Sequence, residues 1–491
     1  MKRHNILKGT SGDALVLMLV KLMTIALSFA VTRLMSQHLS LHDYGTYSQI
    51  LLLVSTVSSL TILGMVDGVN FYYCSEQDPK KRDSYVATIF ALQCIVSLAA
   101  GAVVLLLTEA FREGFDNPDI DKLIIYAAAL PMLQNLMSML QVLLVSVGKA
   151  KILAMRNLLV SLLRLIVVLL MVLFVKTVAV ILLATLLMDA AQVVLFGIIL
   201  RKNNCVIRLG QVNLRLIWQI LQYCIPMAMF ILMRSINRDL DKYMVGLWTD
   251  TENLAVYTNA SKPLPFDVIL YAFGTVLVPQ VIRLVASNRE EQAMSLYKVM
   301  MELGFMTSIV PCLAALTVAP QLMQLLYSKK YMTGLPVFCL YLLVDLLQFT
   351  NMTMILCAAG KTGTLMLIGV GTLGLNAVLN GVLYGQLGIV GPALATLIVT
   401  LITGALIMGL SAKALGAKIR QLFDWKFLLL FITENIAAVF LLQHLRSWLK
   451  TLGWHYMAIL LLVAGLYAGI FLLLHGKRLK RDIRELNTAE E

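Results

Sequence analysis

Apolar stretches recur along almost the whole chain, and each is long enough to cross a lipid bilayer as an α-helix. About 20 mostly apolar residues span the hydrocarbon core. The segments between the stretches are short, so no separate extramembrane domain fits between them. We therefore expect an all-α integral membrane protein with about fourteen transmembrane helices. Their predicted ranges are 14–35, 46–74, 85–108, 123–146, 157–175, 178–200, 215–247, 254–285, 296–326, 332–358, 362–384, 387–412, 425–445 and 454–475.

The composition supports this assignment and excludes two classes of protein. Of the 491 residues, 59% are hydrophobic and only 14% are charged, whereas soluble domains carry about 25% charged residues. A separate soluble enzyme is therefore excluded. The net charge of +13 could suggest a nucleic-acid partner, but most Lys and Arg lie in the short connectors, as membrane topology requires. No nucleic-acid partner is expected.

The basic residues also predict the orientation in the membrane. If the N-terminus is cytoplasmic, 26 of the 40 Lys and Arg fall in inside segments and 7 in outside segments. Such a bias places both termini in the cytoplasm. We expect a multi-pass protein of the cytoplasmic (inner) membrane, with membrane lipids around it.

Three short sequence matches indicate an internal repeat. Because six predicted helices separate equivalent positions, both halves keep the same orientation, which is a parallel repeat known from transporters. This predicts an N-lobe over 1–205, a C-lobe over 206–415, and two extra helices with a basic tail over 416–491. The matches pair 32–35 with 241–244, 148–149 with 360–361, and 184–186 with 395–397, at offsets of 209, 212 and 211.

Seven basic residues lie inside predicted spans, where each would cost at least ~2.5–3.5 kcal/mol if it faced lipid at the bilayer centre. They persist where they face water, a partner or a ligand. For those near helix ends (Arg33, Lys242 and Lys262), snorkelling to the interface explains them equally well. The residues predicted to line a cavity and bind an anionic substrate such as pyrophosphate are Lys21, Arg33, Arg164, Arg234, Arg238 and Lys242.

The helix predicted over 215–247 carries the densest charge. At 100° per residue, Arg234, Arg238, Asp241 and Lys242 fall within an arc of about 100°, and Asp239 points elsewhere. Arg238 is expected to pair with Asp241 at i+3. The stripe keeps net positive charge, which suits phosphate groups.

Acidic residues in the spans offer a second kind of site. Buried carboxylates can bind H⁺ or Na⁺ and so couple transport to an ion gradient, although they can equally neutralise neighbouring cations. The candidates for ion coupling are Asp67, Asp241, Asp345 and Glu434. The cysteines and histidines lack metal-binding spacing, so no metal and no cofactor is expected. Because no catalytic triad or nucleotide loop is present, we expect no catalytic residue and no enzyme.

Two glycine pairs match the spacing of helix-packing motifs. Gly381 and Gly385 in one predicted span, and Gly465 and Gly469 in another, are four positions apart. Small residues at this spacing let helices approach closely. We expect these glycines to form packing contacts within the bundle.

These features together resemble a known family. Arg33 with the stretch 44–48 (Tyr-Gly-Thr-Tyr-Ser), the stretch 241–246 with 255–257, and Gly360-Lys361 resemble the polysaccharide-exporter branch of the multidrug/oligosaccharidyl-lipid/polysaccharide flippase superfamily, whose members include the Wzx-type flippases. The residues 248–252 (Trp-Thr-Asp-Thr-Glu) depart from the glycine-rich turn of the family pattern.

The resemblance implies a pair of helix bundles that alternate between cytoplasm-open and outside-open states. The implied cargo is an undecaprenyl-pyrophosphate-linked oligosaccharide for capsule, O-antigen or exopolysaccharide synthesis, moved with an ion gradient. A polysaccharide polymerase and glycosyltransferases are the implied partners. Three alternatives stay open: a multidrug or cation exporter of the same superfamily, a flippase for the peptidoglycan precursor, and a membrane enzyme. The sequence does not define the sugar, the coupling ion or the oligomeric state.

Overall fold

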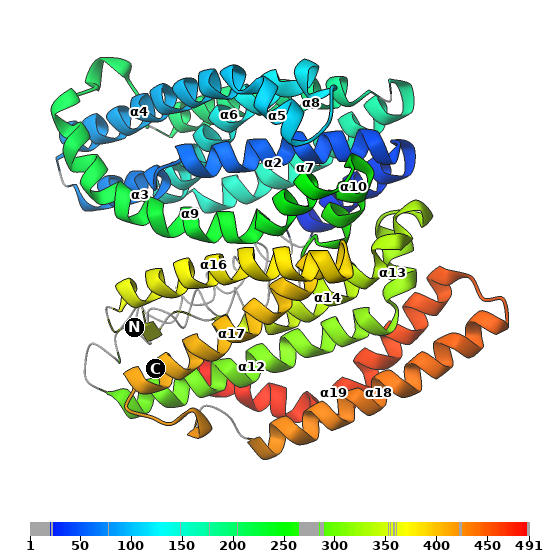
Figure 1. Cartoon of the computed structure of the whole chain (residues 1–491). Helices are drawn as coiled ribbons and strands as arrows, with labels where there is room; N and C mark the ends of the chain where they lie inside the picture. The colour runs from blue at the N-terminus through cyan, green and yellow to red at the C-terminus, as the bar shows by residue number, and fades with distance from the viewer. Residues whose placement is uncertain are drawn as a thin grey trace. The chain divides into compact units, whose positions relative to one another are not determined.

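The structure is a computed structural model of the chain. It describes residues 20 and 23–488 apart from 77, 148, 176, 204, 265–283, 285–288, 352, 354, 357, 358, 360 and 422–424. All regular secondary structure in these described residues is helical (Figure 1). The chain forms two compact units, which divide the sequence between Thr258 and Asn259.

The first unit is built around one central helix. After a helix that ends at residue 38, α6 contacts α2, α3, α4, α7 and α8, and α9 packs on α2, α3 and α4. Leu130, Met139 and Leu143 of α6 are fully buried. The helices are α2 (Leu41–Thr61), α3 (Met65–Ser75), α4 (Pro79–Leu106), α5 (Thr108–Gly114), α6 (Ile120–Ser146), α7 (Ala150–Phe174), α8 (Val178–Lys202), α9 (Ile217–Trp248) and α10 (Thr251–Ala260).

The span predicted over 46–74 is broken in the structure. Helices α2 and α3 meet at an angle of 43°, and Leu63 and Gly64 between them have left-handed φ angles of 43° and 66°. A break inside a membrane frees backbone carbonyls that need new partners. Asn135 of α6, which is buried, donates to the backbone oxygen of Ser58 at 3.1 Å and to the Thr61 hydroxyl at 2.8 Å. The Asn135 amide thus adds a partner from another helix to the Ser58 oxygen, which also accepts from the Ile62 N–H at 3.0 Å.

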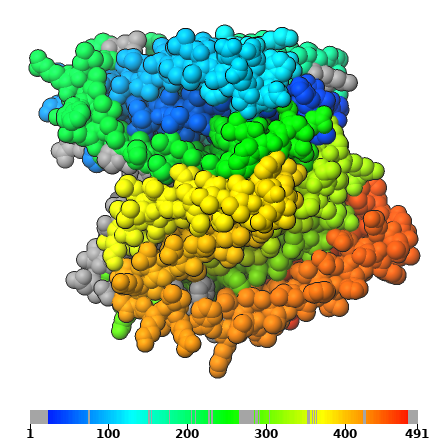
Figure 2. Space-filling model, viewed as in Figure 1, coloured from blue at the N-terminus to red at the C-terminus, as the bar shows by residue number. Residues whose placement is uncertain are grey.

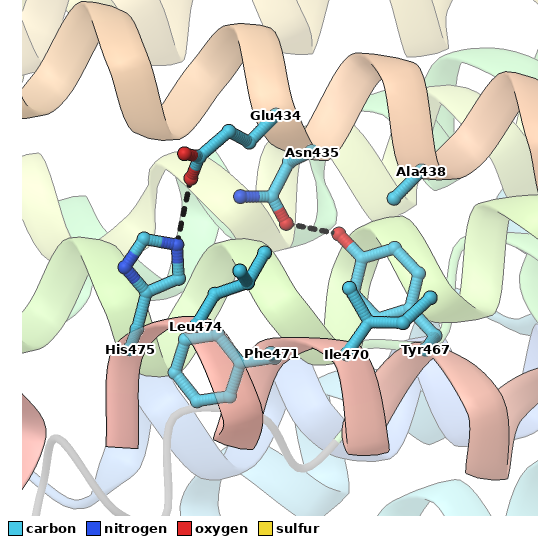
Figure 3. A pocket seen from close by; sticks show the side chains of 8 residues that line it. All are labelled: Glu434, Asn435, Ala438, Tyr467, Ile470, Phe471, Leu474 and His475. Atoms are coloured by element: carbon cyan, nitrogen blue, oxygen red, sulfur yellow. Dashed lines mark hydrogen bonds and ion pairs between the residues drawn. The ribbon is translucent and has the colours of Figure 1, made fainter. Parts of the chain in front are cut away.

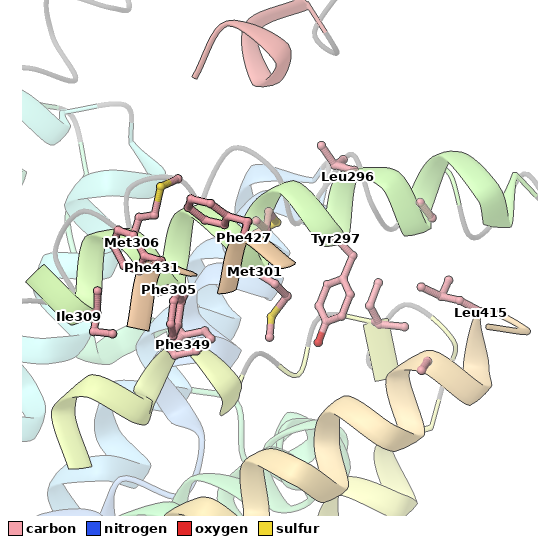
Figure 4. Close-up of a cluster of buried hydrophobic side chains, with 14 residues drawn as sticks. Leu296, Tyr297, Met301, Phe305, Met306, Ile309, Phe349, Leu415, Phe427 and Phe431 are labelled. Atoms are coloured by element: carbon pink, nitrogen blue, oxygen red, sulfur yellow. The ribbon is translucent and has the colours of Figure 1, made fainter. Parts of the chain in front are cut away.

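The second unit consists of long helices around an aromatic core. Helix α12 contacts α14, α18 and α19, and α16 pairs with α17. Phe305 lies against Phe349 and Phe431 with ring centroids 5.5 Å apart in both pairs (Figure 4). The helices are α12 (Glu290–Thr317), α13 (Ala319–Leu326), α14 (Leu335–Leu347), α16 (Thr362–Leu387), α17 (Val390–Ala414), α18 (Trp425–Thr451) and α19 (Tyr456–Thr488).

The surfaces of these helices are strongly apolar. Leu106, Leu441 and Leu473 are 84%, 71% and 87% exposed, as expected for side chains that face lipid. Side chains fill the gaps that the ribbons of α16 and α17 leave between them (Figure 2). By length and composition, nine helices in the described part of the chain can cross a membrane, or up to ten if α2 and α3 form one span.

Most predicted spans coincide with observed helices, and the differences lie at their ends and breaks. The range 296–326 is divided into α12 and α13, and 332–358 contains the short α14. Helix α7 begins at Ala150 and not at 157, so Arg156 lies inside the helix and not in a connector. The range 254–285 lies largely outside the described residues. The lobes 1–205, 206–415 and 416–491 stay a prediction. Contacts between helices place α9 in the first unit, but they do not test whether the two halves of the chain repeat.

The expected packing of the glycine pairs is wrong where it can be checked. An added Cβ at Gly385, Gly465 or Gly469 would meet no atom within 4 Å in the described structure. These glycines therefore lie on helix faces that no described neighbour covers. Close approach occurs instead at Gly45 of α2, where a Cβ would lie 2.0 Å from the backbone oxygen of Thr251.

We expect Gly45→Ala to destabilise the first unit by about 1–3 kcal/mol, because a backbone oxygen cannot move aside as a flexible side chain can. The measurement is the unfolding temperature of the purified protein in detergent. Gly469→Ala is the matched control, since it adds the same methyl group to open space and is expected to be neutral or to stabilise by up to about 1 kcal/mol. Equal unfolding temperatures for the two variants would contradict the close contact.

Candidate functional site

A polar cavity of about 330 Å³ lies between α6, α7 and α8. It is formed by polar residues at helical spacing on otherwise apolar helices, so that one stripe of each helix faces the cavity. Polar side chains in a membrane turn toward such interiors because lipid cannot hydrogen-bond to them. Its polar lining is Gln134, Ser138 and Gln141 of α6, Ser161 and Arg164 of α7, and Thr185, Asp189 and Gln192 of α8.

Arg164 is the cation of this cavity and was predicted as a site residue. It interacts electrostatically with Asp189 of α8 and with the buried Tyr47 of α2. A guanidinium that keeps exposed surface inside a polar cavity can still accept an anion on its free N–H groups. The position of Arg164 fits the predicted role, and anion binding by Arg164 stays a prediction.

Arg156, two turns before Arg164, supports the cavity wall. It is 8% exposed, and its guanidinium lies 4.1 Å from the centre of the Phe196 ring. It donates to Gln192, whose amide donates in turn to Asp189 at 3.1 Å. Sequence analysis missed Arg156 because its turn was assigned to a connector. With Arg156, Arg164 and Asp189, the region carries two cations and one anion.

A second charged group joins α9 to α2. Asp239 accepts from Lys242 at 2.9 Å, from Arg238 at 3.3 Å and from Ser55 of α2 at 3.1 Å. The Asp239 and Lys242 side chains are only 10% and 14% exposed. Arg238 therefore pairs with Asp239, and the pair predicted with Asp241 is wrong. The reason is that side chains of α2 and the adjacent turn gather around Asp239, which the position on the helix alone does not reveal.

Further polar contacts run along the same junction of α2 and α9. Ser59 and Ser235 hydroxyls are 2.6 Å apart, and the Tyr243 hydroxyl donates to the backbone oxygen of Leu52 at 2.6 Å. Asp241 lies on another side of α9, where it is buried and accepts from the Tyr257 hydroxyl at 2.8 Å. The charges of α9 are thus largely held by partners within the first unit.

The remaining predicted site residues are dispersed. Arg33 is half-buried in the helix before α2. Asp67 is half-buried in α3. Asp345 of α14 accepts from the backbone N–H of Leu264 at 2.9 Å. Lys21 and the side chain of Arg234 lie outside the described residues.

Glu434 lies in a separate, tight contact between α18 and α19. Its carboxylate is 2.8 Å from Nε2 of His475, and the neighbouring Asn435 accepts from the Tyr467 hydroxyl (Figure 3). The cavity beside them is about 10 Å³, which is about the space of one water molecule. This geometry suits helix packing, and ion binding by Glu434 stays a prediction. In the part of the chain that is described, no three His, Cys, Asp or Glu residues gather to hold a metal ion.

Solved structures of membrane transporters share the fold over most of the chain. The lipid II flippase MurJ in an inward closed conformation is 14% identical with a TM-score of 0.65, covering 93% of this chain and 99% of its own. An inward-facing multidrug resistance MATE family transporter of the MOP superfamily is 14% identical with a TM-score of 0.63. The match covers 82% of this chain and 98% of the transporter chain. A MOP superfamily transporter from Pyrococcus furiosus is 15% identical with a TM-score of 0.59. The match covers 82% of this chain and 94% of the transporter chain. The fold is therefore that of the multi-pass MOP transporters, and the predicted fold class is confirmed.

The family follows from the sequence. The family model described as polysaccharide biosynthesis protein matches residues 31–336, more than half of the chain. The protein belongs to this polysaccharide biosynthesis family, and the resemblance stated from the sequence motifs is confirmed. No curated protein matches the chain.

Proposed function

We propose that this protein is a flippase that moves undecaprenyl-pyrophosphate-linked oligosaccharide repeat units across the cytoplasmic membrane for capsule, O-antigen or exopolysaccharide synthesis. The observation that carries the proposal is the cavity of α6, α7 and α8, where Arg164 offers a guanidinium among hydrogen-bonding groups of which Asp189 is the one acid. Membership of a polysaccharide biosynthesis family supports the choice of cargo.

The size and charge of the cavity suit the anionic part of that cargo. Ligand pockets in proteins are typically about 300–1,000 Å³, so 330 Å³ holds a small polar group and not a whole oligosaccharide. Arg164 and Asp189 line the cavity, and the buried Arg156 behind its wall gives the region net positive charge. Arginine binds phosphate oxygens through paired N–H groups. We assign the pyrophosphate to this cavity and the sugars to other surfaces.

Transport by alternating access needs a source of free energy, for which we propose an H⁺ or Na⁺ gradient. Asp67, Asp241, Asp345 and Glu434 stay the proposed acidic groups, and no cofactor is part of the proposal. The protein would act without catalysis, in the cytoplasmic membrane and with both termini in the cytoplasm. A polysaccharide polymerase and glycosyltransferases are the proposed partners, since they use and supply such a cargo.

The test is the leaflet location of the lipid-linked sugar in cells that lack the protein. Spheroplasts are treated with an impermeant lectin or oxidant that reaches only the outer leaflet. We expect the sugar to accumulate on the cytoplasmic face and to appear outside again when the wild-type gene is restored. A Cβ added at Gly469 would meet no atom within 4 Å. The Gly469→Ala variant therefore serves as a control for expression and should fully restore the lipid-linked sugar to the outer leaflet.

Two other results would decide against the proposal. If cells that lack the protein show the usual amount of lipid-linked sugar in the outer leaflet but no longer export a cationic drug, the protein is an exporter. Accumulation of the peptidoglycan precursor, with normal polysaccharide intermediates, would make it a flippase for that lipid.

A further inference from the structure

Four aromatic rings from three helices of the first unit form one cluster, the aromatic platform, made of Phe71, Tyr72, Tyr85 and Tyr223. Phe71 of α3 stacks on Tyr223 of α9 with centroids 4.3 Å apart and planes at 16°. Tyr72 stacks on Tyr85 of α4 at 4.2 Å and 12°. The two stacks meet edge to face, since Phe71 and Tyr72 are 5.2 Å apart at 81°. Offset and edge-to-face pairs are the stable arrangements of aromatic rings.

Gln219 of α9 fixes this platform. The Tyr72 hydroxyl donates to its backbone oxygen at 3.0 Å, and the Tyr85 hydroxyl donates to its side-chain oxygen at 2.8 Å. The amide nitrogen of Gln219 keeps its own two donor hydrogens for another partner. The close approach of α3 and α9 depends on Gly68, where a Cβ would lie 2.7 Å from the Cys224 sulfur.

Asp67 adds an acceptor at the edge of the platform. It is half-buried, one helical turn before Phe71, and acts electrostatically on Tyr223 and Cys224. Among the described residues, it makes no ion pair. Ring faces, an amide donor and a carboxylate acceptor therefore lie within one small region.

The platform lies near one membrane surface. Phe71, Tyr85 and Tyr223 are within two turns of the ends of α3, α4 and α9, and Lys80 and Lys81 lie in the first turn of α4. Rings that only anchor a protein at the interface keep their polar tips in water, as the exposed Trp218 can. Here the hydroxyls of Tyr72 and Tyr85 are bonded to Gln219, and Phe71 presents 43% of its surface with no polar group.

We propose that the aromatic platform is a binding subsite for the oligosaccharide of the cargo, in which a pyranose ring lies on Phe71 and its hydroxyls bond to Gln219 and Asp67. The C–H face of a pyranose is apolar and packs on an aromatic ring by dispersion, while its hydroxyls need both donors and acceptors. This inference rests on the proposed function. In the predicted orientation, the subsite is on the cytoplasmic side, where the cargo is taken up.

The experiment is saturation-transfer NMR on the purified full-length protein in detergent. The probe is the repeat-unit oligosaccharide released by mild acid from the host's own polysaccharide, with maltotriose as a second sugar. When the aromatic protons of the protein are saturated, we expect transfer to the sugar ring protons. Phe71→Leu and Gln219→Leu should each weaken binding about 2- to 12-fold, the effect of one aromatic contact and of one hydrogen bond, respectively. Trp218→Leu, a matched aromatic loss on the same helix turn as Gln219, should leave binding unchanged.

Each other outcome has a defined meaning once unfolding temperatures show that the variants are folded. Equal transfer in wild type and Phe71→Leu, or an equal loss in Trp218→Leu, would overturn the subsite. Binding of tetraphenylphosphonium in place of the sugar would make the platform a cation site. If the wild-type protein restores outward appearance of the lipid-linked sugar but binds no oligosaccharide, the subsite is wrong and the flippase function stands. If the wild-type protein does not restore the lipid-linked sugar to the outer leaflet, the proposed flippase function itself is wrong.

Discussion

Arg164→Gln is expected to reduce the outward appearance of the lipid-linked sugar about 10- to 100-fold at unchanged protein level. A hydrogen bond to a charged group contributes about 1.5–3 kcal/mol, and each 1.4 kcal/mol is a factor of ten. Glutamine keeps hydrogen-bonding capacity but removes the charge that faces Asp189 and the proposed pyrophosphate. The measurement is labelling of spheroplasts by an impermeant probe, normalised to the amount of protein.

Lys149→Gln is the matched control for this loss of charge. Lys149 is an exposed cation at the N-terminus of the same helix and does not line the cavity, so transport should stay within about twofold of wild type. A second variant, Arg164→Lys, keeps the charge but not the paired N–H groups and should be intermediate. If Arg164→Gln transports as well as Lys149→Gln, the cavity does not bind the anionic group.

Asp239→Asn is expected to have the largest effect on stability. Lys242 and Arg238 share this carboxylate, and both Lys242 and Asp239 are largely buried. Removing one partner of a buried ion pair costs about 3–5 kcal/mol, because the other charge is left without compensation. Ser55 of α2 would also lose its acceptor. We expect a lower unfolding temperature in detergent and less protein in the membrane.

The double variant Asp239→Asn/Lys242→Met separates this cause from a general defect. Methionine removes the uncompensated ammonium and keeps an apolar stem of similar length, so part of the lost stability should return. Glu252→Gln, at an exposed position at the start of α10, is the control and should change stability by less than about 0.5 kcal/mol. A wild-type unfolding temperature for Asp239→Asn would show that the pair is not needed.

Most helices could be predicted from the sequence. In lipid, an apolar run long enough to span the membrane must satisfy its backbone N–H and C=O groups within itself, and it does so by forming a helix. Helices α8 and α17 lie within two or three residues of their predicted ranges. The start of α7 was missed because Lys149, Lys151 and Arg156 make its first turns resemble a connector. The break after Thr61 was missed because Ile-Leu-Gly continues the apolar run. Its partner, Asn135, lies far away in the sequence.

The candidate site was predicted in part, and the limits have physical causes. Arg164 was found because a cation deep in a span is costly. The rest of the cavity was present in the sequence as polar residues at i, i+4 and i+7 on α6 and α8, which a search for charges alone overlooks. Helical angles place Cβ atoms but not the ends of long side chains, so they could not pair Arg238 with Asp239. The aromatic platform joins residues of three helices, and no short-range pattern reveals it.

The broken α2–α3 segment has a consequence for the order of events during synthesis. Ser58 and the Asn135 that satisfies it are 77 residues apart in the chain. At about 5–20 residues per second, the ribosome makes Asn135 roughly 4–15 seconds after Ser58. During that interval the Ser58 oxygen has only the partners within its own segment, the Ile62 N–H at 3.0 Å and the Thr61 hydroxyl at 3.3 Å. The contacts that tie the break to the rest of the first unit therefore form only when α6 arrives beside it, so the fixing of the kink is a late step of assembly.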